Sequence, residues 1–183
     1  VSAENPLVIY SEDSDQCHTF CEFLLGFKKD ADFSVFINDM LCTEVYRRVL
    51  REKAILLSEP EWFAGSIYDN LLLNHRGIAT DKLMDWLNYF GLAEKILRQP
   101  DGLKTIVYDW QTVFSELELY ELMVIRTLLV EPELIVIDRV LDKFRKEDAQ
   151  RILDALSPLH RSVKILLTQR KSLRPFDNLL ELP

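Results

Sequence analysis

The chain has 183 residues, of which 48% are hydrophobic, so it is long enough to bury the core of one domain or of one domain with a lobe. Thirty acidic residues against 22 basic ones give a formal net charge of −8, and the basic pairs along the chain are short and isolated. This balance argues against a nucleic-acid-binding protein, because such proteins hold phosphate backbones with clustered lysine and arginine.

The sequence also argues against a membrane-spanning or secreted chain. No apolar run approaches the roughly 20 residues that cross a bilayer, and Val1–Pro6 lacks a basic segment followed by an apolar one. Three cysteines without a framework spacing indicate reduced thiols in place of a disulfide scaffold. We therefore expect a soluble, cytoplasmic protein with no span in this chain.

Short apolar runs recur along the chain, as is typical of buried strands. From the N-terminus, we expect strands at Leu7–Tyr10, Phe33–Ile37, Lys53–Leu57, Leu134–Ile137, Val163–Leu167 and Leu179–Leu182. Between them, helical patterns lie at Gln16–Gly26, Thr43–Arg51, Thr80–Phe90, Leu92–Leu97, Ser115–Val130 and Lys146–Leu156. Thr80 is the expected N-cap of its helix.

The alternation of strands and helices predicts an α/β fold, a mostly parallel sheet flanked by helices on both faces. Residues 65–103 interrupt it with consecutive helices and no convincing strand. The expected organisation is one domain over residues 1–183. Its α/β core occupies 1–64 and 104–183, and a helical lobe occupies 65–103.

The first strand is followed by an unusual loop, SEDSDQCHTF at Ser11–Phe20. A strand, a short loop and a helix start form the setting in which proteins hold phosphate, because unpaired backbone N–H groups converge there. This loop has no glycine and carries three carboxylates, Glu12, Asp13 and Asp15. We expect one of them, or Ser14, to accept hydrogen bonds from backbone N–H groups near residues 16–18.

Several motifs resemble those of the nucleotide-binding domain of ABC (ATP-binding cassette) exporters. Phe63-Ala64-Gly65-Ser66-Ile67 with Asn70 resembles the family's segment F-x-G-T-I-x-E-N, and Gln99–Thr105 resembles its L-P-x-G-x-D/K-T turn. Leu134–Asp138 resembles the Walker B strand, and Leu166–Arg170 lies where the family has I-T-H-R. The motifs follow in the family's order over nearly the whole chain, so the resemblance implies a P-loop NTPase-like fold.

The same resemblance implies that the catalytic motifs have degenerated. The family's phosphate loop, G-x-S-G-x-G-K-S-T, falls on Ser11, Glu12, Asp13, Ser14, Asp15, Gln16, Cys17, His18 and Thr19. Every glycine is replaced, Cys17 stands for the lysine and His18 for the magnesium-holding serine, so only Thr19 matches. Because glycines allow the backbone to approach phosphate and lysine neutralises it, we expect ATP and magnesium to bind weakly or not at all.

Other catalytic positions differ in parallel. The glutamine that senses magnesium falls on Ser58, and the switch histidine falls on Gln169. Asp138 matches the Walker B aspartate, whereas the general base after it falls on Arg139, which cannot accept a proton. The signature motif L-S-G-G-Q falls on Phe114, Ser115, Glu116, Leu117 and Glu118, which places Glu116 and Leu117 at its two glycines.

These differences predict a non-enzymatic cassette, a pseudo-ATPase that serves as a structural or regulatory protein-interaction module of an exporter-like system. Its expected partner is a transmembrane domain or another cassette, with a homodimer as one possibility, at the inner face of the membrane. The family's N-terminal antiparallel strands are expected to be absent, and with them the aromatic residue that stacks on adenine. The alternatives are an ATPase subunit that still binds nucleotide weakly, and a ligand- or metal-binding domain on the same scaffold.

Two groups of residues allow other interpretations. Cys17, His18 and Cys21 could form a thiol–imidazole cluster, although we expect buried or solvated thiols and no metal site. The tryptophans Trp62, Trp86 and Trp110 could mark a partner surface, since tryptophan is enriched at binding hot spots, or could be core aromatics.

Overall fold

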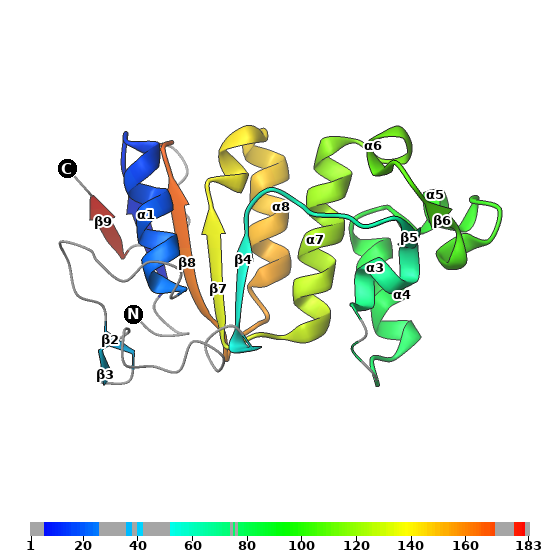
Figure 1. Cartoon of the computed structure of the whole chain (residues 1–183), viewed down its shortest axis with the longest axis horizontal. Helices are drawn as coiled ribbons and strands as arrows, with labels where there is room; N and C mark the ends of the chain where they lie inside the picture. Colours follow the sequence, from blue (N-terminus) through cyan, green and yellow to red (C-terminus); the bar gives the residue numbers. More distant parts are fainter. Residues whose placement is uncertain are drawn as a thin grey trace. The chain divides into compact units, whose positions relative to one another are not determined.

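The computed structural model describes residues 6–25, 36–37, 40–41, 52–73, 75, 77–170 and 178–181, and the helix expected at Thr43–Arg51 lies outside them. The chain divides into two compact units. The first combines Val1–Ser58 with Pro132–Pro183, and the second is Glu59–Glu131, a longer segment than the expected lobe at 65–103. The predicted α/β fold with a parallel sheet is confirmed (Figure 1).

The first unit contains a five-stranded sheet in the order β4-β7-β8-β1-β9, and all four strand pairs are parallel. Its strands are β1 (Leu7–Tyr10), β4 (Ala54–Leu57), β7 (Leu134–Asp138), β8 (Val163–Thr168) and β9 (Leu179–Glu181). A separate antiparallel pair joins β2 (Phe36–Ile37) to β3 (Met40–Leu41). The parallel register places the carboxyl ends of β1, β4, β7 and β8 at one edge of the sheet, which we call the carboxyl edge.

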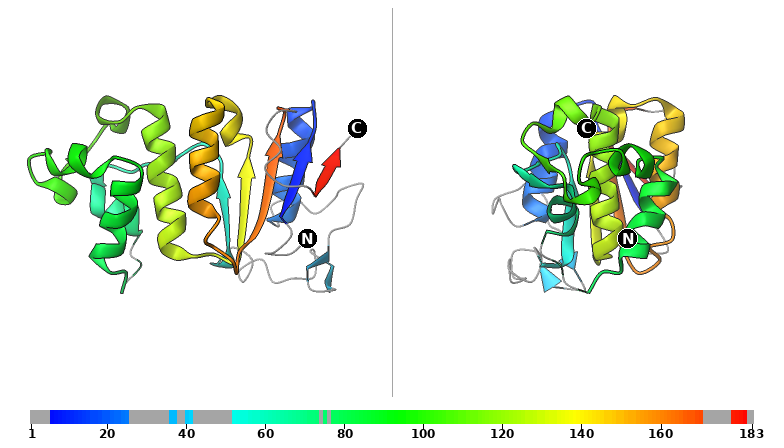
Figure 2. Two further views of the ribbon diagram at one scale, coloured as in Figure 1. Left: turned by 180° about the vertical axis from the view of Figure 1, so that it is seen from behind. Right: turned by 90° about the vertical axis from the view of Figure 1, so that its right-hand side faces the viewer.

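Helices cover both faces of this sheet. They are α1 (Ser14–Leu24) and α8 (Lys146–Leu156), and a short 3-10 helix, η3 (Val140–Lys143), follows β7. The front and back views of Figures 1 and 2 show α1 and α8 on opposite faces. The apolar residues of α8 recur at helical spacing and are buried, which is the pattern of a helix with one face on a core.

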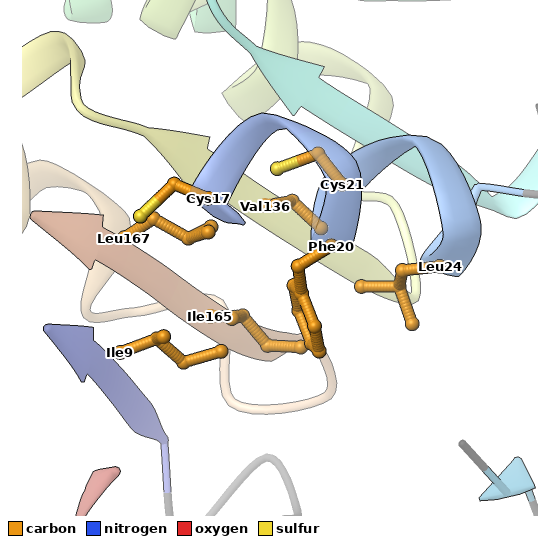
Figure 3. Close-up of a cluster of buried hydrophobic side chains, with 8 residues drawn as sticks. All are labelled: Ile9, Cys17, Phe20, Cys21, Leu24, Val136, Ile165 and Leu167. Atoms are coloured by element: carbon orange, nitrogen blue, oxygen red, sulfur yellow. The ribbon is translucent and has the colours of Figure 1, made fainter. Parts of the chain in front are cut away.

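A buried cluster joins α1 to the sheet. Figure 3 shows its side chains, which come from α1, β1, β7 and β8: Ile9, Cys17, Phe20, Cys21, Leu24, Val136, Ile165 and Leu167. Cys17, Phe20, Cys21 and Leu24 recur every three or four residues, so they share the face of α1 that meets the strands. This packing fixes the start of α1 at the carboxyl edge.

The second unit is mostly helical. Its helices are α3 (Ile67–Leu72), α4 (Thr80–Tyr89), α5 (Ala93–Leu97), η2 (Gly102–Lys104), α6 (Trp110–Val113) and α7 (Glu116–Val130). Two residues, Gly65–Ser66 (β5), pair antiparallel with Ile106–Val107 (β6), so the expectation of no strand at 65–103 is wrong at β5. The expected cap at Thr80 is also wrong, because the N-cap of α4 is Ala79, without a side-chain hydrogen bond.

Candidate functional site

Side chains of the loop between β1 and α1 accept hydrogen bonds from two of the loop's own backbone N–H groups. Asp13 is the N-cap of α1, and its Oδ1 accepts a 2.8 Å hydrogen bond from the backbone N–H of Asp15. The hydroxyl of Ser11, which is fully buried, accepts from the N–H of Asp13 at 3.1 Å and donates to Gln16 Oε1 at 3.2 Å. The loop is therefore an ordinary capped helix start.

The prediction of an internal carboxylate cap near residues 16–18 is confirmed. The Asp13 carboxylate accepts from the backbone N–H of Asp15, which directly precedes that range. The donor lies there because α1 begins at Ser14, two residues earlier than the helix expected from Gln16, so its orphan N–H groups also begin earlier. The side chain of Ser14 lies outside the described atoms.

Replacing Asp13 with alanine is expected to lower the free energy of unfolding by about 1 kcal/mol, the usual cost of losing an N-cap side chain. Replacing it with asparagine, which caps equally well, should cost only a few tenths of that, about 0.2–0.4 kcal/mol. Urea unfolding of the two variants beside the parent protein measures both values. Equal midpoints for all three proteins would show that this cap contributes nothing.

The thiols after the loop are core side chains. Cys17 and Cys21 are buried in the cluster on α1, whereas the His18 side chain is 60% exposed. Burial raises the pKa of the Cys17 thiol to about 11 and also raises the pKa of Cys21, so both thiols stay protonated and unreactive near neutral pH. Within the described residues, no three His, Cys, Asp or Glu side chains are placed to hold a metal ion.

Asp138 ends β7 at the carboxyl edge and forms an ion pair with its neighbour. The Nε of Arg139 donates to Asp138 Oδ1 at 2.9 Å, and only 5% of the Asp138 side chain is exposed. The imidazole of His18 lies near the other carboxylate oxygen of Asp138, with Nδ1 3.9 Å from Oδ2. The hydrogen bond to Asp138 raises the pKa of Arg139, so this group remains a cation.

Arg139 adopts a backbone conformation that side chains rarely take. Its φ of +55° is left-handed, which costs roughly 1–2 kcal/mol for a residue with a Cβ. Its backbone N–H donates to the carbonyl of Leu167 at 3.0 Å, and its side chain holds Asp138. Two anchors therefore keep Arg139 in this conformation, and the cation stays on the carboxylate.

A second network links the ends of β1 and β8. Gln169 Nε2 donates to the backbone carbonyl of Glu12 at 2.9 Å, and its backbone N–H donates to Asp142 Oδ2 at 2.8 Å. The hydroxyl of Thr168 donates to the other oxygen of Asp142. Asp142 was not singled out from the sequence, because its partners lie more than 20 residues away and no local pattern marks them.

Two further predicted positions, Ser58 and Thr19, belong to the first unit. Ser58 directly follows β4 and is half-buried at the carboxyl edge, and Thr19 is half-buried on α1. Thus the structure brings together at this edge the residues of the loop at 11–19 with Ser58, Asp138, Arg139 and Gln169. The signature-equivalent residues, Phe114–Glu118, belong to the second unit.

The signature-equivalent segment forms a capping box in place of a glycine turn. Ser115 is the N-cap of α7: its Oγ accepts from the N–H of Glu118, and the Glu118 carboxylate accepts from the N–H of Ser115 at 2.7 Å. Burial alone would raise the pKa of Glu118, but hydrogen bonds from Lys95 and Ser115 outweigh it and lower the pKa. The Glu116 side chain is exposed in the first turn, where a carboxylate stabilises the helix dipole.

Comparison with known proteins supports the resemblance to ABC exporters. No protein-family model matches the chain. It is 26% identical over 129 residues to the mycobactin import ATP-binding/permease protein IrtB of Mycobacterium tuberculosis, covering 69% of this chain and 22% of that protein. It is 28% identical over 131 residues to the ABC-type transmembrane transporter verA of Clonostachys rogersoniana, covering 68% of this chain and 10% of that protein.

Among solved structures, that of a bacterial Atm1-family ABC exporter with ATP bound is similar to this chain, with a TM-score of 0.81 and 17% sequence identity. The similarity covers 100% of this chain and 32% of the exporter chain. The predicted resemblance to the nucleotide-binding domain of ABC exporters is therefore confirmed. The chain spans less than a quarter of the length of the curated relatives named above. No helix within the described ranges is both long and apolar enough to cross a membrane.

Proposed function

We propose that this chain is a non-catalytic ABC cassette, a pseudo-ATPase that acts through protein contacts. The observation that carries the proposal is the ion pair between Asp138 and Arg139. Asp138 is the one carboxylate that matches a catalytic position, and in the family it helps to hold magnesium. Here the Arg139 guanidinium donates a hydrogen bond to one oxygen of Asp138, and Arg139 is the residue at the position of the family's general base.

The loop at 11–19 does not fit a nucleotide either. A phosphate loop works because several backbone N–H groups stay free and converge on the ligand. In this loop Asp13 accepts from the Asp15 N–H, and Ser11 accepts from the Asp13 N–H. Glu12, Asp13 and Asp15 are exposed carboxylates, so an incoming triphosphate meets negative charge where the family offers a lysine.

Gln169, at the switch position, supports the same proposal. A switch residue has to reach the terminal phosphate from the end of its strand. The Gln169 side chain instead donates to the Glu12 carbonyl, and its backbone is anchored by Asp142. These bonds join the loop to the end of β8 without a ligand.

For partners we propose a transmembrane domain or a second cassette of an export system, at the cytoplasmic face of a membrane, with a homodimer as one form. The support is the similarity to a protein described as an ATP-binding/permease protein and to one described as a transmembrane transporter. A cassette without turnover would hold or gate such a partner.

A second candidate function is an ATPase subunit that binds nucleotide weakly. The observation in its favour is that Thr19 and Asp138 both match the family at the carboxyl edge. Neither residue supplies a lysine for phosphate or a base for water, so this candidate predicts binding without efficient turnover.

Phosphate release from Mg-ATP tests the proposal. We expect the purified chain to release phosphate no faster than its Asp138→Asn variant, because neither protein has a base to activate water. The comparison separates the chain's own activity from that of a contaminating ATPase, which the substitution does not affect. Turnover that depends on Asp138 would refute the pseudo-ATPase assignment.

A further inference from the structure

The end of β8 and the short helix η3 are tied together by two side chains that reach in opposite directions. The Asp142 carboxylate, on η3, accepts from the Thr168 hydroxyl and, at 2.8 Å, from the backbone N–H of Gln169. In the other direction, Arg170 Nη1 donates to the backbone carbonyl of Phe144 at 2.6 Å, at the residue that caps the end of η3. Segments 26 residues apart in the sequence are thus held together at the carboxyl edge.

The same end of β8 also holds the loop at 11–19. Gln169 Nε2 donates to the Glu12 carbonyl at 2.9 Å, across 157 positions of the sequence. The backbone N–H of Ser11, which is fully buried, donates to the Thr168 carbonyl at 3.3 Å. The loop is therefore joined to β8 by one buried bond between backbone groups and by one exposed bond from a side chain.

The Glu12 carbonyl can accept from Gln169 because it lies outside the hydrogen-bond ladder of α1. Asp13 is the N-cap of this helix, so the first carbonyl of the ladder belongs to Asp13. Glu12, Asp13 and Asp15 expose three carboxylates within four positions, and their like charges repel one another. The neutral amide of Gln169 therefore holds an acidic segment in place without adding a further charge to it.

We propose that Gln169 is a latch, a side chain that holds the loop at 11–19 on the end of β8 in the ligand-free chain. Asp142 is the positioning residue of this latch, because it fixes the backbone of Gln169 and thereby directs the amide to the Glu12 carbonyl. The inference rests on the proposed function in one respect: a cassette that binds no nucleotide needs bonds of its own to keep this edge in one conformation.

Amide hydrogen exchange of the isotope-labelled whole chain, followed by NMR at the Ser11 N–H, tests the latch. Opening of the loop breaks the bond from this N–H, so we expect the Ser11 amide to exchange about three to ten times faster in Gln169→Ala than in the parent. The control Gln150→Ala removes a bond of the same kind on α8, from Nε2 to Asp154 Oδ1 at 2.8 Å, and should leave the Ser11 amide unchanged. Equal exchange at Ser11 in Gln169→Ala and in the parent would overturn the latch.

The role of Asp142 is tested by the same exchange. Asp142→Ala removes the acceptor of the Gln169 N–H, so the Ser11 amide should exchange about three to ten times faster in the parent background. In the Gln169→Ala background the same substitution should have no further effect, because the amide that Asp142 positions is already absent. Asp142→Asn keeps an acceptor oxygen for the Gln169 N–H and should restore nearly the parent rate. Additive effects of the two alanine substitutions, or equal rates in Asp142→Asn and Asp142→Ala, would overturn the positioning role.

The amides of β7 serve as an internal reference for global unfolding. We expect their exchange to be the same in Gln169→Ala and in the parent, because the latch opens only locally. If they accelerate as much as the Ser11 amide, the change is global and the latch is overturned. All these measurements use the ligand-free chain, so their failure leaves the proposed function standing. Saturable Mg-ATP binding would refute the proposed function and leave the latch standing.

Discussion

Replacing Arg139 with glutamate, the residue that the family has at this position, is expected to lower the free energy of unfolding by about 2–4 kcal/mol. The substitution removes the cation from Asp138, whose side chain is 5% exposed, and puts a second carboxylate beside it. Breaking a buried ion pair costs about 3–5 kcal/mol, and the partial exposure of Arg139 reduces that figure. The left-handed backbone at this residue remains strained in either case, because glutamate also has a Cβ.

Urea unfolding of the Arg139→Glu variant, beside the parent and an Arg161→Glu variant, measures this cost. Arg161 is exposed, so the Arg161→Glu substitution makes the same change in charge at a site without a buried partner. It should change the free energy of unfolding by no more than about 0.5 kcal/mol. The Arg139→Glu variant should also show no ATP turnover, since the loop at 11–19 still lacks the lysine and the glycines of the family's phosphate loop. Similar midpoints for the two variants would show that the ion pair is not what holds Asp138.

We also expect that the chain does not bind ATP with measurable affinity. In the family the phosphate loop contributes one lysine and several free N–H groups to the triphosphate. The chain offers three carboxylates and a self-capped helix start, and a charge pair near a protein surface is worth about 4 kcal/mol at 4 Å. We therefore expect a dissociation constant above about 1 mM, which corresponds to about 4 kcal/mol or less of binding free energy.

Restoring the loop should not rescue binding. The substitutions Ser14→Gly, Gln16→Gly and Cys17→Lys return the family's residues, yet Cys17 is fully buried in the core cluster on α1. A lysine there either buries its charge or disrupts the packing of α1 against the sheet. The proposed loss of nucleotide binding would thus depend on the core as well as on the loop.

Much of the fold could be predicted from local patterns. Five of the six apolar runs became β1, β4, β7, β8 and β9 with boundaries shifted by a residue or less, and the helix expected at Lys146–Leu156 is α8. Of the strand expected at Phe33–Ile37, only β2 (Phe36–Ile37) lies within the described residues. These elements are recognisable because their burial repeats with the period of a strand or helix. The order of the motifs, more than any one of them, identified the resemblance to ABC exporters.

The features that were missed depend on contacts between distant residues. The pairing of β5 with β6 joins two-residue strands about 40 positions apart, too short for a periodic signal. Asp142 acquires its role from Thr168 and Gln169, and the start of α1 is set by Asp13 acting as a cap. Arg139, which pairs with its neighbour Asp138, also has a left-handed backbone conformation that no pattern in the sequence indicates.

Calorimetric titration of the whole chain with Mg-ATP tests the central claim most directly. The account predicts no saturable heat up to about 1 mM nucleotide, and the same result for the variant with the restored phosphate loop. One-to-one binding with a micromolar dissociation constant would contradict it, because the loop at 11–19 would then hold a triphosphate despite its carboxylates and its internal cap.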